Sequence, residues 1–76
     1  MPVLDNTPVP WSIMVTKTST PGERIWGVTW RAYKGSTLVQ VTSVTTATDA
    51  DDWTSLQSQI TADMTDAYAT AGYAVP

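Results

Sequence analysis

Hydrophobic and polar residues alternate along the first half of the chain, a period of two that is typical of β-strands with one buried face. In WSIMVTKT (11–18) every second residue from Trp11 to Val15 is large and apolar. The same alternation runs through RIWGVTWRAYKG (24–35) and TLVQVTSV (37–44). The pattern therefore predicts three half-buried strands.

Two turns predict how these strands pair. Pro21-Gly22 is typical of the central pair of a tight turn, and Gly35-Ser36 of a two-residue type II′ hairpin turn. Counting back from each turn gives a register. The predicted pairs are Val15–Val28, Ile13–Trp30 and Trp11–Ala32 across the first turn, and Lys34–Thr37, Tyr33–Leu38, Ala32–Val39, Arg31–Gln40, Trp30–Val41 and Thr29–Thr42 across the second.

This register collects apolar residues on one face of the predicted sheet. A slip of one residue would exchange the faces, so the agreement of two separate turns supports the register. The predicted core face holds Trp11, Ile13, Val15, Trp26, Val28, Trp30, Ala32, Val39 and Val41. The other face holds Ser12, Thr16, Gly27, Thr29, Arg31, Gln40 and Thr42, with Met14, Ile25, Tyr33, Leu38 and Val44 among them.

After a threonine-rich link at 45–48 the hydrophobic period changes to three and four, which predicts an amphipathic helix over 49–71. Thr48 or Asp49 is suited to cap its start, the aspartates that follow suit its first turn, and Gly72 is suited to end it. The predicted apolar stripe consists of Trp53, Leu56, Ile60, Met64, Ala67 or Tyr68, and Ala71.

These elements predict an α+β fold: a three-stranded antiparallel β-meander with one C-terminal α-helix across its apolar face (βββα). We expect a single domain over 11–72. Residues 1–10, with three prolines, form an extended arm, and residues 73–76 a short apolar tail. No signal peptide or membrane-spanning run is visible, so we expect a soluble protein.

Composition speaks against catalysis. The 76 residues include no cysteine and no histidine, so no serine has a histidine to activate it, and we expect no enzyme, cofactor or metal site. The acidic run DADD (49–52) lacks the glycine and glutamate of an EF-hand loop, and helix capping explains it with fewer assumptions. Asp63 and Asp66 fall on the solvated side of the predicted helix.

The stretch 24–35 interleaves aromatic and basic residues, as a platform for single-stranded nucleic acid would. Its tryptophans, however, lie on the predicted core face, and the net charge is −3. We therefore expect neither nucleic acid nor a membrane as a partner.

The third predicted strand lies at an edge of the sheet, and residues 36–48 contain no charge. Edges are normally guarded by lysine, proline or a bulge, and an unguarded edge can accept a strand from a partner. The alternative is that the N-terminal arm or the tail covers this edge. The residues predicted to bind a partner are Val3, Leu4, Val9, Tyr33, Leu38, Gln40, Thr42, Val44, Tyr73 and Val75.

A small core, an unguarded edge and two apolar arms favour a non-enzymatic protein that works inside a larger complex. The first hypothesis is a small structural subunit: a virion (phage) cement, decoration or minor structural protein, oligomeric or bound to its neighbours. The alternative is a phage-encoded inhibitor of one host protein, binding through an acidic helix surface. An accessory subunit of a bacterial complex is a third hypothesis. The expected location is the virion or the host cytoplasm. The acidic surface consists of Asp51, Asp52, Asp63 and Asp66.

Overall fold

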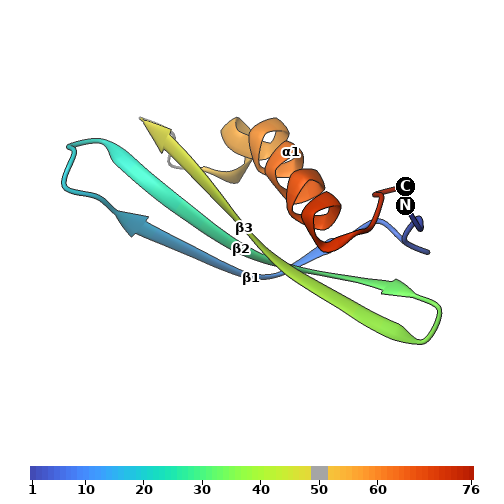
Figure 1. Ribbon diagram of the computed structural model, residues 1–76. Helices are drawn as coiled ribbons and strands as arrows, with labels where there is room; N and C mark the ends of the chain where they lie inside the picture. Colours follow the sequence, from blue (N-terminus) through green and yellow to red (C-terminus); the bar gives the residue numbers. More distant parts are fainter. Residues whose placement is uncertain (49–51) are drawn as a thin grey trace.

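The computed structural model describes residues 1–48 and 52–76. Strands β1 (Val9–Lys17), β2 (Glu23–Lys34) and β3 (Thr37–Thr48) form one antiparallel sheet in the order β1-β2-β3. Helix α1 (Trp53–Ala71) lies across one face of this sheet, and the chain ends lie together (Figure 1). The predicted βββα fold is confirmed.

The register between β2 and β3 is the predicted one from Lys34↔Thr37 through Thr29↔Thr42. Gly35 has a φ of 62°, the positive value that the first residue of such a tight hairpin turn needs. Residues 45–48, expected to be a link, instead continue β3 as far as Thr48. They keep the alternation, because Thr45 and Ala47 are buried with Ser43 on the face that carries α1.

The turn between β1 and β2 is centred where expected, but the first pair of residues in the ladder lies further from the turn than predicted. The Glu23 amide donates to the Thr20 carbonyl at 3.1 Å, and Gly22 has a φ of 80°, so Pro21-Gly22 is the centre of a type II turn. The first strand pair is Lys17↔Arg24. The predicted Val15–Val28 pair is therefore wrong by two residues along β2, a shift that leaves every side chain on its predicted face.

Trp11 is the exception to this rule. The register changes between Pro10 and Ser12, so Trp11 lies in an irregularity of β1 and does not pair with Ala32. Its side chain is 64% exposed, and the prediction that Trp11 belongs to the core is wrong. The physical reason is the neighbouring proline, which has no N–H to donate to the ladder and favours a bulge or a strand end.

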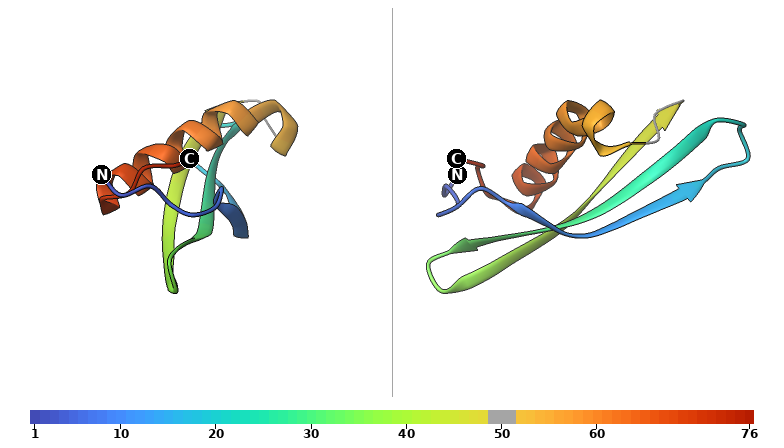
Figure 2. Two further views of the ribbon diagram at one scale, coloured as in Figure 1. Left: turned by 90° about the vertical axis from the view of Figure 1, so that its right-hand side faces the viewer. Right: turned by 180° about the vertical axis from the view of Figure 1, so that it is seen from behind.

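The core lies between α1 and the part of the sheet formed by β2 and β3. Helix α1 packs along β3 and leaves β1 uncovered, so all nine residues of β1 are exposed (Figure 2). Ile13 and Val15 were expected in the core, and this expectation is also wrong: they face the side of α1 but lie beyond its reach. Val41 is only partly buried. The buried apolar residues are Leu4, Trp26, Val28, Trp30, Ala32, Val39, Ala47, Leu56, Ile60, Met64 and Tyr68.

Two buried side chains of this core donate hydrogen bonds to a neighbouring element, whereas the buried Trp26 Nε1 has no partner in the described chain. Trp30 Nε1 donates to Ser43 Oγ at 2.9 Å, and the Tyr68 hydroxyl donates to the Val39 carbonyl at 3.0 Å. Burial raises the pKa of Tyr68, so this hydroxyl keeps its proton to a higher pH than a free tyrosine does. The ring of Trp53 packs 6.0 Å from that of Trp30, between centroids. Buried polar atoms with partners avoid the desolvation penalty and fix the helix over the sheet.

Helix α1 is capped at both ends, by Asp52 before its first residue and by Gly72 after its last. Asp52 caps its start by accepting a hydrogen bond from the Ser55 amide at 2.7 Å. The expected cap Thr48 is instead the last residue of β3, and Asp49 lies outside the described residues. The first turn of α1 contains no acidic residue, contrary to expectation. Gly72 ends the helix with a φ of 95°, as predicted.

The two chain ends bind each other. The Leu4 amide donates to the Ala74 carbonyl at 2.9 Å, and the Ala74 amide donates to the Pro2 carbonyl at 2.8 Å. The Asp5 amide donates to the Tyr33 carbonyl at 2.8 Å, which fixes this pair of segments to the end of β2. The arm and tail are thus part of the folded unit, and β1 begins at Val9, two residues earlier than predicted.

A pair of tryptophan substitutions tests this fold. We expect Trp30→Ala to lower the free energy of unfolding by about 3–5 kcal/mol, because it leaves a cavity and orphans the Ser43 hydroxyl. We expect Trp11→Ala to lower it by less than about 1 kcal/mol, the value of an exposed cation–π contact. Urea unfolding followed by circular dichroism measures both. Equal losses would mean that Trp11 is buried as well.

Candidate binding surface

Most acidic side chains in the described ranges, Asp66 excepted, are bonded to neighbouring residues of the chain. Among these residues no group of three acidic side chains is close enough to hold a metal ion. Asp63 accepts a hydrogen bond from Thr45 Oγ1, which ties α1 to β3. Asp5 forms an ion pair with Lys34 at 3.6 Å and accepts from the Gly35 amide. These carboxylates accept hydrogen bonds that stabilise neighbouring segments of the fold.

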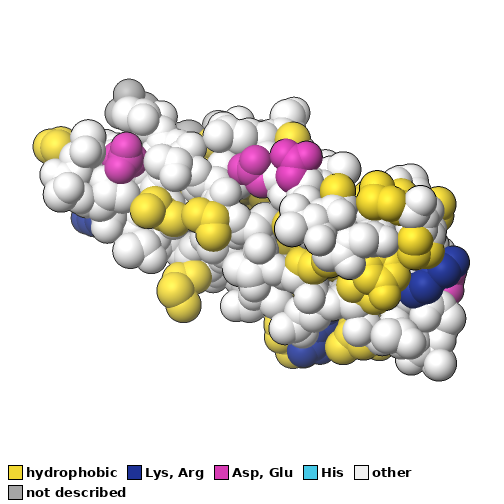
Figure 3. Space-filling view, in the orientation of Figure 1, with side chains coloured by type: hydrophobic (Ala, Val, Ile, Leu, Met, Phe, Trp, Pro, Cys, Tyr) yellow, Lys and Arg dark blue, Asp and Glu magenta, His cyan; other side chains and the backbone are white. Residues whose placement is uncertain are grey.

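The sheet face opposite α1, which we call the open face, is covered by no other element of the described chain (Figure 2). Between the terminal pairs of the strands, Arg31 is the only charged residue on it. In Figure 3 hydrophobic side chains are spread along the molecule, whereas acidic and basic ones are few. The open face consists of Val9, Trp11, Ser12, Met14, Thr16, Ile25, Gly27, Thr29, Arg31, Tyr33, Leu38, Gln40, Thr42, Val44 and Thr46.

Large apolar side chains on the open face are exposed to an unusual degree. Met14 is 67% exposed and Val44 62%, and these two flank Gly27 in one row across the three strands. Tyr33 and Leu38, which form a cross-strand pair near the β2–β3 turn, are exposed as well. Exposed apolar side chains gathered on one face are typical of contact regions.

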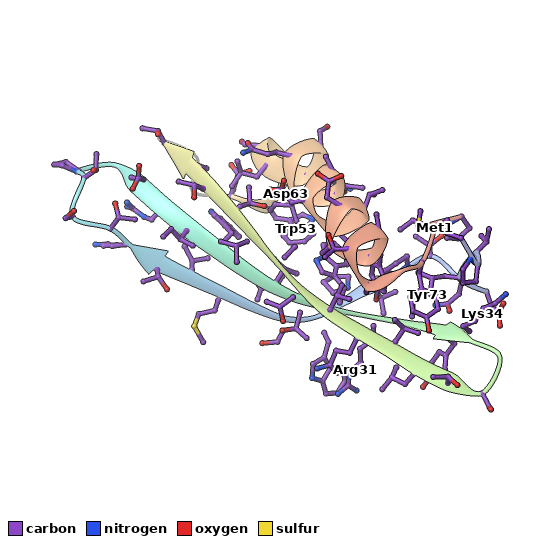
Figure 4. All side chains as sticks on the ribbon, in the orientation of Figure 1. Met1, Arg31, Lys34, Trp53, Asp63 and Tyr73 are labelled. Atoms are coloured by element: carbon purple, nitrogen blue, oxygen red, sulfur yellow. The ribbon has the colours of Figure 1, made fainter. Side chains whose placement is uncertain are left out.

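Three side chains of the open face, Trp11, Arg31 and Gln40, contact one another and hold the Arg31 guanidinium in place. The guanidinium carbon Cζ of Arg31 lies 3.7 Å from the centroid of the Trp11 ring, and Arg31 Nε donates to Gln40 Oε1 at 2.9 Å. Figure 4 shows Arg31 on the far side of the sheet from α1, whereas Trp53 points into the space beneath the helix. The sequence reasoning missed Trp11 on this face. The signal was Pro10, which disturbs the pairing of the residue after it.

The outer edge of β3 is partly occupied. Because Lys34 and Thr37 flank a two-residue turn and exchange hydrogen bonds, the even-numbered residues of β3 direct their backbone groups away from β2. At one of these, Gln59 Nε2 of α1 donates to the Thr46 carbonyl at 3.2 Å. Neither the arm nor the tail covers this edge, since both lie at the end of β2. From Leu38 to Val44 no described residue contributes a backbone hydrogen bond to it.

The outer edge of β1 is the more accessible one. Counting from the same alternation, Ile13 and Val15 direct their backbone groups outward. Proline at Pro10 guards one end and Lys17 the other, but the middle carries no guard. Sequence reasoning considered only β3, although a three-stranded meander has two edges.

The residues predicted to bind a partner divide into two groups. The structure brings Tyr33, Leu38, Gln40, Thr42 and Val44 together on the open face. Of those in the arm and tail, Leu4 is 3% exposed and belongs to the core, Tyr73 and Val75 pack against that core, and Val3 is exposed. Val9, expected in the arm, is the exposed first residue of β1 and pairs with Arg31.

The alternative acidic surface is less coherent. Asp52 caps α1 and Asp63 is bonded to Thr45, while Asp66 is exposed one turn further along. Asp51 lies outside the described residues. Two of the three described members therefore hold the fold together.

No family model, no curated protein and no solved structure matches this chain. Helix α1, the one helix in the part of the chain that the structure describes, is too polar to cross a membrane. The open face must therefore be interpreted from its own chemistry.

The capping aspartate gives a pH-dependent prediction. The Ser55 amide lowers the pKa of Asp52, so the charged form stabilises the fold above the ordinary aspartate pKa, and this contribution is lost as the pH falls through the lowered value. We expect Asp52→Ala to reduce the melting temperature at pH 7, with a gap to wild type that narrows toward pH 2. Asp52→Asn is the matched control, because asparagine caps without titrating. A constant gap across this range would contradict the assignment.

Proposed function

We propose that this chain is a non-enzymatic structural subunit of a larger assembly, of the virion cement, decoration or minor structural class, which binds its neighbours through the open face. The observation that carries the proposal is the exposure of Met14, Val44 and Trp11 on a face that no described segment covers. A protein that worked alone would gain nothing from presenting these side chains to water.

The geometry of the sheet supports a broad, flat contact. The molecule extends 43 Å in its longest direction and 20 and 17 Å in the other two, so most of its length is the β2–β3 hairpin. Threonines such as Thr29 and Thr42, whose hydroxyls lie 3.3 Å apart, fill the space between the apolar residues. Such a surface offers dispersion contacts and short hydrogen bonds, with little dependence on charge.

The strand edges add a second mode of contact to the same surface. Backbone groups at Ile13 and Val15 on one edge, and at Gln40 and Thr42 on the other, point away from β2. A partner strand that pairs with either edge extends the sheet, and its side chains then continue the open face. Many weak contacts of this kind, repeated over a lattice of subunits, give stable binding by valency.

The test is size fractionation of a tagged chain in its native source, at low and high salt. We expect the chain to migrate in complexes far above its own 8.2 kDa, and to remain there at about 0.5 M salt, where charge interactions are screened within about 4 Å. We expect Val44→Lys to weaken binding at least about tenfold, or about 1.4 kcal/mol, by placing a charge in an apolar contact.

Ser58→Lys on the exposed side of α1 is the control and should change nothing. Migration of the wild-type chain at its own mass would contradict the proposal. Complexes that dissolve in salt, tolerate Val44→Lys and are lost with Asp66→Lys would support the inhibitor alternative.

A further inference from the structure

Gly27 stands at the centre of the open face without a side chain. It lies in the middle of β2, paired with Met14 of β1 on one side and Val44 of β3 on the other. Glycine weakens a strand, because it has the most conformational freedom to lose and nothing to pack. A glycine in the central strand of a small sheet therefore needs a reason.

Nothing in the described chain supplies that reason. The glycines with positive φ are Gly22, Gly35 and Gly72, so the backbone of Gly27 is one that any residue adopts. A Cβ built on Gly27 would meet no atom closer than the Met14 carbonyl oxygen at 3.9 Å, an ordinary contact distance. Neither conformation nor internal packing requires glycine here. In strands, glycine often marks the place where another chain approaches closely.

We propose that a second copy of this chain packs its open face on the first and inserts Met14 into the space above Gly27, which we call the Gly27 gap. The contact is reciprocal: a two-fold axis between β1 and β2 places Met14 of each copy over Gly27 of the other. Met14 lies one strand away from Gly27, is 67% exposed, and has the unbranched, flexible side chain that fills irregular spaces. This inference rests on the proposed function and names its first partner.

Charge and shape favour a second copy over an unrelated partner. The β1–β2 rows on either side of the Gly27 gap, Ser12 with Thr29 and Thr16 with Ile25, carry no charge, so two copies meet without like-charge repulsion. Arg31, the exception, is already held against Trp11 and Gln40. A face that is uncharged and apolar at its centre complements itself.

The shared area sets the strength of this dimer. With the axis between β1 and β2, only these two strands of each copy face each other, and β3 lies outside the contact. Two strands about 4.8 Å apart, over the nine residues of β1 at about 3.4 Å per residue, give roughly 300 Å² per copy and roughly 600 Å² in total. This area is below that of permanent interfaces, so the expected dimer is weak and reversible.

Sedimentation equilibrium of the full-length chain over a wide concentration range tests this. We expect the wild type to dimerise, Gly27→Val to raise the dissociation constant at least about tenfold, and Gly27→Ala to raise it less. Both should melt at or above the wild-type temperature, because a β-branched or alanine side chain suits a strand better than glycine. Ala62→Val, which adds bulk on the exposed side of α1, should leave the dissociation constant unchanged.

Reciprocal insertion makes one further prediction that other geometries do not. Met14→Ala alone should weaken the dimer, yet a mixture of Gly27→Val and Met14→Ala chains should form heterodimers more tightly than Gly27→Val chains pair with themselves. In the mixture the filled gap faces the shortened side chain, and the other contact is intact.

A wild-type chain that stays monomeric, or a Gly27→Val chain that dimerises as the wild type does, overturns the second copy as occupant. If fractionation in the native source still shows a complex that Val44→Lys disrupts, the assembly function stands and the partner is another protein. If it shows none, both proposals fail.

Discussion

One helix can shield only one face of a three-stranded sheet, and the rest of this structure depends on that limit. Helix α1 spans 19 residues, packs along β3, and is followed by a tail that joins the arm at the end of β2. No further described segment is left to cover β1 or the open face. The core therefore occupies one side of the sheet, and the apolar residues on the other side remain in water.

Large aromatic rings and buried hydrogen bonds stabilise a core that lies on only one face of the sheet. Trp26, Trp30 and Trp53 fill the space between α1 and the sheet, and Ser43 and Thr45 occupy core positions of β3 because each has a partner, in Trp30 and Asp63. A chain of 76 residues buries a smaller share of its surface than larger domains do, so its stability is modest. Covering the open face adds burial that the chain cannot provide by itself.

The parts of the fold set by local rules could be predicted, and the parts set by tertiary competition could not. The two-residue turn at Gly35 fixes the register of β2 with β3 through short-range geometry, so alternation alone was enough. The five residues between β1 and β2 (18–22), in place of a two-residue loop, shifted the pairing of β1, and the irregularity at Trp11 then moved one aromatic ring to the opposite face. The uncovered state of Ile13 and Val15 follows from where α1 lies, which no local pattern encodes.

The same limit explains why the proposed binding surface differs from the one expected from the sequence. The apolar residues of the arms and the uncharged third strand both suggested contact with neighbouring proteins. The sequence alone does not show which of these segments packs on the chain itself and which stays exposed. In the fold, Leu4 fills the core and the two ends pair with each other, so the arms serve the chain itself. The role that we propose for Gly27 depends on this arrangement. Its missing side chain leaves a gap that a partner can reach, because Gly27 lies at the centre of the uncovered face and not beneath α1. The surface that our proposal assigns to a partner is therefore the open face of the sheet and not the arms.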